Sequence, residues 1–318
     1  MFDILGIDLM PCVDLNVNVD SLPKPNEGSK MNKMTWQGGG KVSTGMVAAA
    51  RLGAKCALAG TVGDDIFGRF CVKDFERHGI DISNLHIHKG KTSVSVVMSD
   101  LETRGRSIMN MPTTVPRIRF EEIDPSIIQS AKYLFFARVN ETIVKAVDAA
   151  RNAGVKVFID ADSYSDDIQS LIPKIDYFIG SEFYYRHLFE NDNFKRNCRE
   201  LAEMGPQVVV FTLGNKGCVG LGPDGFFSVP TYPVTVVDTV GAGDVFHGAF
   251  LAALVAGWRP RDAADFANAV SSIKCTRIGG RAGIPDMKTV LRFMKDGFID
   301  YTEIDKRVEL YERGLDNV

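Results

Sequence analysis

The sequence has little of what marks several large classes of protein. Its 37 Lys and Arg nearly balance its 40 Asp and Glu, for a formal net charge of −3, and the basic residues are scattered. A nucleic-acid-binding surface needs clustered positive charge, so we expect no nucleic-acid partner. The most membrane-like run, residues 248–258, is too short to span a bilayer, so we expect no membrane partner either.

Cysteine and histidine patterns that build metal sites or disulfide frameworks are also missing. The 6 cysteines form no CxxC pair, and His78, His86 and His88 have no carboxylate arranged with them as a ligand set. We therefore predict no protein metal site and expect the cysteines to act as small apolar residues. The first residues lack the basic start and apolar core of a signal peptide, which indicates a reducing, cytoplasmic setting.

What the sequence does contain is a regular alternation of apolar, β-branched runs with amphipathic helical segments. Its 318 residues, 45% of them hydrophobic, suit a single α/β domain over residues 1–318. One helix is predicted between Asp64, as N-cap, and Gly79, and another between Asn140 and Gly154. The alternation predicts a mainly parallel sheet with helices on both faces, a three-layer α/β/α fold. The predicted strands lie at 55–63, 133–138, 155–160, 177–181 and 208–214.

Three segments depart from this alternation. Residues 9–38 and 91–111 carry short alternating runs with no helix between them, which predicts an antiparallel flap or lid on the main domain. Residues 299–318 are highly charged and predict a surface helix without a catalytic role.

One stretch, VDTVGAGDVFHGAF at residues 237–250, places glycine where an apolar, extended run (231–240) gives way to a helix that ends near Gly257. Gly241, Ala242 and Gly243 form the turn at the start of that helix. Free backbone N–H groups and the helix dipole favour an anion there, and glycine lets a large anion come close.

Asp244 follows this turn directly and has two interpretations. Acidic residues often complement the dipole in a first helical turn. Alternatively, Asp244 takes the proton of a substrate hydroxyl while the neighbouring N–H groups hold a phosphoryl group in transfer. A dinucleotide-binding fingerprint is disfavoured because the third glycine is misplaced and Asp262 opens another helix. His247, one turn further on, is expected to pack or to lie at the surface.

Two long segments resemble the signatures of one family. Residues 238–250 resemble the C-terminal signature of the ribokinase-like (PfkB) carbohydrate kinases, and residues 38–69 resemble their N-terminal signature. The resemblance extends over about residues 1–295. It implies a ribokinase-like fold, ATP-dependent phosphorylation of a sugar, ATP and Mg²⁺ as cofactors with K⁺ as a further candidate, and a homodimer formed through the lid.

The same resemblance implies roles for particular residues. Asp244 resembles the catalytic base, and Gly241, Ala242 and Gly243 resemble the anion hole. The positions that resemble the sugar site are Asp14, Gly39, Gly40 and Thr44, the last standing where the family usually has asparagine. Those that resemble the nucleotide side are Thr212, Gly214, Gly217, Asn268, Glu182 and Asp238. Asp238 and residues 275–283 resemble positions that border adenine and, in some members, a monovalent cation.

A second departure concerns magnesium. The family's N-x-x-E motif falls on Ser181 and Tyr184, so only Glu182 keeps its acidic character. The resemblance then leaves Mg²⁺ to ATP, water and either Asp160 or Glu182.

Within the family, residues 236–250 and 274–286 resemble sulfofructose kinases, which phosphorylate the 1-hydroxyl of 6-deoxy-6-sulfofructose. Their sulfonate-binding lysine, asparagine and arginine match Lys30, Asn110 and Arg138. Arg138 follows a buried strand, where a charged group normally faces a ligand or a carboxylate. Lys30 and Asn110 are equally well explained as loop and turn residues.

Three functions therefore stay open. The chain is a kinase for an anionic ketose, a kinase for a neutral sugar such as fructose, ribose or 2-keto-3-deoxygluconate, or a sugar- and nucleotide-binding protein without catalysis. Arg104 and Arg106, on the predicted flap, are either further ligands of an anionic sugar or solvated side chains.

Overall fold

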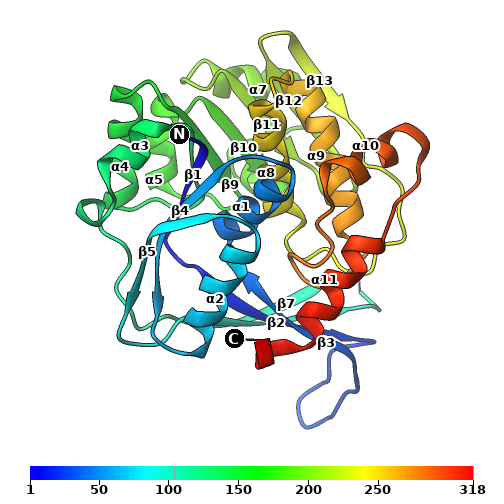
Figure 1. Ribbon diagram of the computed structural model, residues 1–318. Coiled ribbons are helices and arrows are strands. Elements are labelled where there is room, and N and C mark those ends of the chain that lie inside the picture. Colours follow the sequence, from blue (N-terminus) through cyan, green and yellow to red (C-terminus); the bar gives the residue numbers. More distant parts are fainter. Residues whose placement is uncertain (104, 318) are drawn as a thin grey trace.

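A sheet of nine strands runs through the centre of the molecule, in the order β13-β12-β11-β10-β9-β8-β1-β4-β5 (Figure 1). The structure, a computed structural model, describes residues 1–103 and 105–317. The strands from β5 to β11 pair in parallel, and β12 and β13 add an antiparallel edge. The mainly parallel sheet predicted from the sequence is confirmed. Its strands are β1 (Phe2–Asp8), β4 (Cys56–Gly63), β5 (Asp81–His88), β8 (Ala131–Phe136), β9 (Lys156–Ala161), β10 (Tyr177–Ser181), β11 (Val208–Thr212), β12 (Cys218–Gly222) and β13 (Gly225–Val229).

Helices cover both faces of this sheet and form two separate apolar cores with it. One core joins the sheet to α1 (Lys41–Arg51), α2 (Ile66–Arg77), α8 (Ala242–Val255), α9 (Pro260–Lys274), α10 (Met287–Asp296) and α11 (Thr302–Glu312). The other joins it to α3 (Pro125–Ser130), α4 (Glu141–Asn152), α5 (Asp166–Leu171), α6 (Glu182–Leu188) and α7 (Phe194–Ala202). The three-layer α/β/α architecture is therefore confirmed.

A second sheet, the lid, lies at the lower edge of the body in Figure 1. It has the order β3-β2-β6-β7, formed by β2 (Cys12–Val19), β3 (Met31–Gly39), β6 (Ser93–Asp100) and β7 (Arg106–Met111). The predicted antiparallel arrangement is wrong at its centre, where β2 and β6 pair in parallel. β2 follows β1, and β6 follows β5, after a short connection in each case. Because β1 and β5 run in the same direction in the main sheet, β2 and β6 enter the lid in the same direction.

Two local predictions also need correction. Asp65, not Asp64, caps α2 by accepting a hydrogen bond from the Gly68 N–H, while Asp64 accepts one from the Gly90 N–H. Residues 231–240 form no strand, although their β-branched side chains favour extended backbone. The N–H groups of Val237 and Asp238 bond only to the Cys275 carbonyl, so the segment lacks the neighbouring strand that a ladder needs.

The C-terminal segment is more than a surface helix. Ile304, Val308 and Tyr311 of α11 are buried in the core, and the Tyr311 hydroxyl donates to Asp74 of α2 at 2.7 Å. Figure 1 shows α11 lying against lid strand β3, where Lys33 pairs with Glu312 at 2.5 Å. Charged residues dominate the composition of this segment, but its apolar residues recur at helical spacing and face the body.

Candidate active site

α1 and α8 cross within their first two turns. A Cβ on Gly248 of α8 would lie 2.0 Å from the carbonyl oxygen of Gly45 in α1. Only glycine at position 248 allows the two backbones to come this close. The crossing brings the Gly40 turn that precedes α1 beside the Gly241 turn that precedes α8.

The turn at residues 241–243 has the geometry of an anion site. Gly241 adopts a left-handed conformation with φ of 72°, and no side chain of the described residues caps α8. The N–H groups of Gly243 and Asp244 fall in the first helical turn, where no intrahelical acceptor exists. These N–H groups and the helix dipole thus point toward any anion placed ahead of α8.

Asp244 lies in this first turn among other carboxylates. Its pKa is raised to about 8, chiefly by burial and next by the charge of Asp160, while Lys41 acts in the opposite direction. A carboxyl group with a pKa near neutrality suits proton acceptance far better than an ordinary aspartate does.

Lys41 and Asp160 belong to the same cluster, and the sequence interpretation gave Lys41 no role. The Lys41 ammonium lies 2.7 Å from Asp162. Burial alone would lower the pKa of Lys41, but Asp160 and Asp162 raise it. The signal for Lys41 was its position in the first turn of α1, where a cation opposes the helix dipole and needs a local partner.

Asp160 is the unusual member of the cluster. Its side chain is only 1% exposed, yet neither carboxylate oxygen accepts a hydrogen bond within the described chain. His247 Nε2 lies 3.5 Å from one of these oxygens, and His247 Nδ1 lies 2.6 Å from the Gly243 carbonyl oxygen. His247 is buried, in keeping with the packing role expected for it.

The lid presents Asp14 and Asn110 on one face. Asp14 of β2 pairs with Ser95 of β6, which in turn pairs with Asn110 of β7, so the three side chains share a face. The Ser95 hydroxyl donates to Asn110 Oδ1 at 2.8 Å. A Cβ on Gly39 would lie 2.4 Å from the Asp14 carboxyl group, so Asp14 and the glycine turn are in direct contact.

Thr44 is buried, and its side chain contacts Arg281. Its hydroxyl accepts from Arg281 Nε at 3.3 Å. The Arg281 guanidinium is fully buried, pairs with Asp74 at 2.6 Å and donates to the Gly39 carbonyl at 2.7 Å. A buried arginine therefore holds the Gly39 turn in place through its carbonyl oxygen.

The structure separates the three residues that match a sulfonate site. Asn110 shares the Asp14 face, and exposed Arg138 follows β8 at the carboxyl edge of the main sheet. Lys30 is exposed and immediately precedes Met31, which pairs with Val19. Val19 lies five residues along β2 from Asp14, or about 16 Å, so the structure does not bring Lys30 to this site. Arg106 pairs with Ser99 on the Asp14 face, and Arg104 lies outside the described residues.

The residues that match a nucleotide site surround the ends of β10 to β12. Thr212 ends β11, and Gly214 and Gly217, with φ of 58° and 88°, shape the turn into β12. A Cβ on Gly217 would lie 2.0 Å from the Val229 carbonyl oxygen, so a larger residue cannot replace it. Asn268 donates to the carbonyls of Val229 and Pro230 at 3.2 and 3.1 Å.

On this side, Glu182 and Asp238 have polar partners within the chain, and Phe183 is an exposed aromatic residue. Glu182 lies 3.4 Å from Arg186, and Ser181 and Tyr184 serve as N-cap and buried core residue of α6. Asp238 accepts from the Ser99 hydroxyl and from the N–H groups of Val240 and Gly279. Phe183 is 81% exposed beside these strand ends, an aromatic surface that the sequence analysis did not single out.

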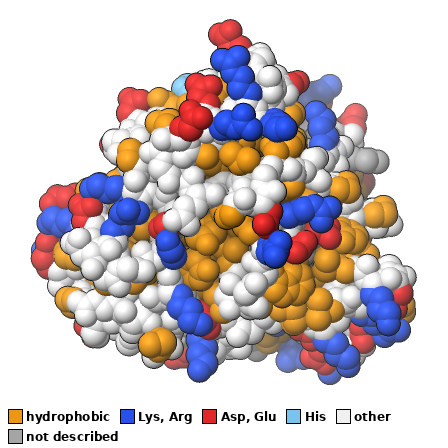
Figure 2. All heavy atoms as spheres, turned by 90° about the horizontal axis from the view of Figure 1, so that it is seen from above, with side chains coloured by type: hydrophobic (Ala, Val, Ile, Leu, Met, Phe, Trp, Pro, Cys, Tyr) orange, Lys and Arg blue, Asp and Glu red, His pale blue; other side chains and the backbone are white. Residues whose placement is uncertain are grey.

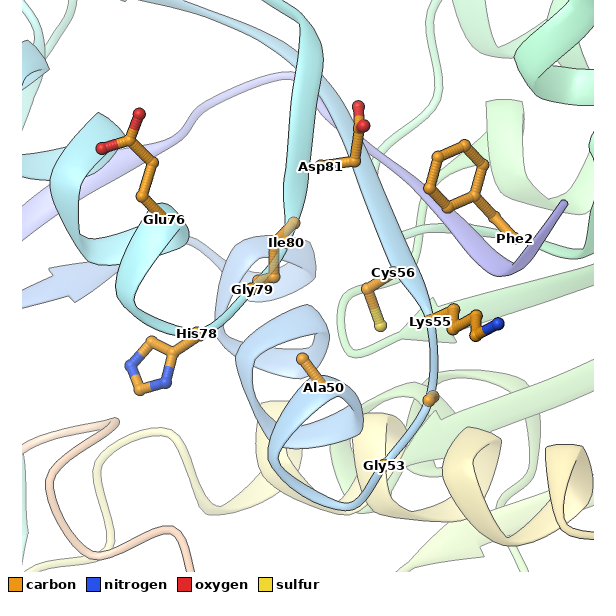
Figure 3. A pocket seen from close by; sticks show the side chains of 11 residues that line it. Phe2, Ala50, Gly53, Lys55, Cys56, Glu76, His78, Gly79, Ile80 and Asp81 are labelled. Atoms are coloured by element: carbon orange, nitrogen blue, oxygen red, sulfur yellow. The ribbon is translucent and has the colours of Figure 1, made fainter.

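The other hollows and surfaces lie away from this cluster. An open hollow of about 590 Å³ lies at the opposite edge of the sheet, between the loops that precede β4 and β5 (Figure 3). Seen from the top of Figure 1, acidic and basic side chains are interspersed among apolar ones (Figure 2). Among the described residues, no helix is long and apolar enough to cross a membrane, and no group of three His, Cys, Asp or Glu is suited to a metal ion.

Comparison with known proteins points in one direction. A family model described as pfkB family carbohydrate kinase matches residues 1–287. The chain is 28% identical to a probable fructokinase-3 of Arabidopsis thaliana over 81% of its length and 83% of the relative's. It is 26% identical to an ATP-dependent ribose-1-phosphate kinase of Halopiger xanaduensis, covering 90% and 96% of the two chains. The crystal structure of a ribokinase from Thermotoga maritima superposes with a TM-score of 0.80 at 26% identity, covering 93% and 100%.

Proposed function

This chain belongs to the pfkB family of carbohydrate kinases, and within that family we propose that it phosphorylates an anionic ketose, with Asp244 as the catalytic base. It is an ATP-dependent sugar kinase, as its family and relatives show. The observation that carries the assignment of Asp244 is its place in the first turn of α8, directly beside backbone N–H groups that face outward.

The proposed reaction uses this arrangement in one step. The sugar hydroxyl oxygen attacks the γ-phosphorus of ATP, its proton passes to the Asp244 carboxylate, and ADP leaves. The N–H groups of Gly241, Gly243 and Asp244 hold the negative charge of the phosphoryl group, while the Ala242 N–H already donates to the Thr239 carbonyl oxygen at 3.2 Å. Lys41 adds a positive charge nearby. Asp14 and Gly39 hold the sugar hydroxyls from the lid side.

The chain offers Mg²⁺ one well-suited ligand. Asp160 is buried with both carboxylate oxygens free of hydrogen bonds, and hard oxygen ligands are those that Mg²⁺ prefers. Mg²⁺ usually keeps several waters and takes one or two protein carboxylates together with substrate phosphates. We assign Asp160 to this role, in which bound Mg²⁺ would neutralise phosphate charge, and leave Glu182 to its contact with Arg186.

The anionic substrate class rests on Arg138. Its guanidinium is exposed at the carboxyl edge of the sheet, and no described residue pairs with it. Asn110 and Arg106 lie on the lid face that also carries Asp14. Together these groups suit a sulfonate or phosphate at the far end of the sugar, as in 6-deoxy-6-sulfofructose phosphorylated at its 1-hydroxyl.

A neutral polyol is the second candidate, and a different observation favours it. Asn16 and Thr35 lie on the Asp14 face of the lid, and each has a buried polar atom without a partner in the described chain. Such atoms can form hydrogen bonds with sugar hydroxyls, and this kind of recognition requires no charge on the substrate.

The lid also supports the homodimer implied by the family. Met34, Met109 and Met111 lie on the face opposite Asp14 and are 48%, 56% and 45% exposed. A second lid laid over this face would cover these side chains. Sedimentation equilibrium of the wild type and of Met109→Glu tests this: a dimer that the substitution dissociates is expected, and a wild-type monomer contradicts it.

The first experiment measures sugar-dependent ADP release from ATP and Mg²⁺. The panel is sulfofructose, fructose 6-phosphate, fructose, ribose and 2-keto-3-deoxygluconate. We expect an anionic ketose to be preferred and Arg138→Gln to raise its KM at least tenfold, while the control Arg151→Gln does not. Preference for a neutral sugar overturns the anionic class but leaves the kinase intact.

Asp244→Asn separates chemistry from binding. We expect kcat to fall by about 10² or more while sugar and ATP still bind, because the base is lost and the turn remains. An unchanged kcat would refute the role of Asp244. Absence of turnover with every sugar, despite ATP binding, would favour a binding protein without catalysis.

A further inference from the structure

The Lys274 ammonium lies directly before the turn at residues 241–243, where the family resemblance implies a monovalent cation. Lys274 is the last residue of α9, and its side chain is fully buried. Its Nζ donates to the carbonyl oxygen of Asp238 at 3.1 Å and to that of Val240. Both partners are main-chain oxygens, the ligand type that also binds desolvated monovalent cations.

These oxygens are the ones that K⁺ would need. The family resemblance placed a monovalent cation beside Asp238, but the ammonium already uses the Asp238 carbonyl. The Asp238 carboxylate is also engaged, since it accepts from Ser99, Val240 and Gly279. A second cation here would compete for the same oxygens and face repulsion from Lys274. The residues present therefore do not fit K⁺.

We propose that Lys274 is a built-in cation that makes this kinase independent of added monovalent cations. The inference rests on the proposed function, because it concerns the turn that binds the phosphoryl group. The Val240 carbonyl and the Gly241 N–H belong to one peptide unit. A donor on that carbonyl polarises the unit and makes the Gly241 N–H a stronger donor toward an anion.

The packing around Lys274 keeps this charge in place. A Cβ on Gly283 would lie 2.4 Å from the Lys274 carbonyl oxygen, so the loop after α9 closes directly over the residue. Ser271, one turn earlier in α9, donates to the Ala242 carbonyl at 3.0 Å and ties α9 to the start of α8. Lys274 is thus a positioning residue that acts through the turn and does not touch the sugar.

The test compares ions and variants in full-length protein. ATP turnover and the thermal unfolding midpoint are measured in K⁺, Na⁺ and choline buffers for the wild type, Lys274→Met, Lys274→Ala and the control Lys295→Met. Lys295 is an exposed lysine near the end of α10. We expect both wild-type readouts to be equal in the three buffers, and the control to match the wild type.

For the two Lys274 variants we expect turnover to fall about tenfold or more. The larger cavity of Lys274→Ala should give partial recovery in K⁺ but not in choline. The unfolding midpoint of Lys274→Ala should rise in K⁺ over choline. A wild type that is stimulated several-fold by K⁺, or a Lys274→Met variant with full turnover, overturns the proposal. If no sugar supports turnover, the proposed function fails instead, and the ion dependence of the unfolding midpoint still tests Lys274.

Discussion

Arg281→Met removes one half of a buried ion pair, and its effect on stability can be worked out from the contacts. Arg281 and Asp74 are both fully buried and lie 2.6 Å apart. The guanidinium also donates to the Gly39 carbonyl and to Thr44, and the second Asp74 oxygen accepts from Tyr311. Methionine fills much of the volume but leaves the Asp74 charge and the Gly39 carbonyl without their partner.

Breaking a buried pair from one side typically costs about 3–5 kcal/mol. Since a folded domain is stable by about 5–15 kcal/mol, this variant should lose a large part of its stability. Tyr311→Phe removes a single hydrogen bond to the same carboxylate and should cost about 1–3 kcal/mol. Burial would raise the pKa of Asp74, but Arg281 brings it below its usual value, so the contribution of this carboxyl is present at neutral pH and lost as the pH falls through that lowered pKa.

Urea denaturation at neutral pH measures these differences in the free energy of unfolding. The matched control is Arg259→Met, which removes an exposed arginine 3.4 Å from Asp224 and should leave stability nearly unchanged. If Arg281→Met lies within about 1 kcal/mol of the wild type, the reasoning from burial is wrong.

Three other outcomes follow from individual contacts. Gly39→Ala should raise the sugar KM at least tenfold without changing the ATP KM, because its Cβ would lie 2.4 Å from the Asp14 carboxyl group. Gly28→Ala, with open space around residue 28, is the control. Equal sugar KM values for the two variants would contradict the close contact. The pH profile of kcat/KM should rise and level off above about 8, since Asp244 accepts a proton only when ionised; a flat profile in this range would speak against the assignment. The raised pKa of Asp244 also affects stability. Its stabilising contribution is fully present below the unfolded pKa of 3.8 and is lost as the pH rises to about 8. Asp65→Ala should lower stability by about 0.5–2 kcal/mol through loss of the α2 cap, with Asp64→Ala costing less, and the reverse order in urea titrations would restore the sequence-based choice.

The glycine turns and the alternation of elements were visible in the sequence because each is a local pattern. Gly241 with Asp244, and Asn140 with Gly154, mark helix ends through neighbours a few residues away. These predictions needed no knowledge of distant segments, and the structure confirms both helices.

The contacts that support the site could not be predicted in this way. Arg281 and Asp74 lie 207 residues apart in the chain, and nothing local distinguishes either from a surface residue. Lys274 looks like an ordinary lysine in the last turn of a helix, and only the fold shows that it is buried beneath residues 238–240. Lys30 was matched by sequence position, and the lid register then placed it far from Asp14.

The contact between Gly45 and Gly248 has a mechanical consequence. With the two helix backbones touching, α1 and α8 cannot slide past each other without losing that contact. The Gly40 turn precedes α1 and the Gly241 turn precedes α8, so the proposed sugar and phosphoryl sites keep a fixed distance and direction relative to each other. The lid is joined to the body by the short connections before β2 and β6 and by the packing of α2 on β2 and of α11 on β3. The relative direction of the two proposed sites therefore depends on this helix pair and not on the position of the lid.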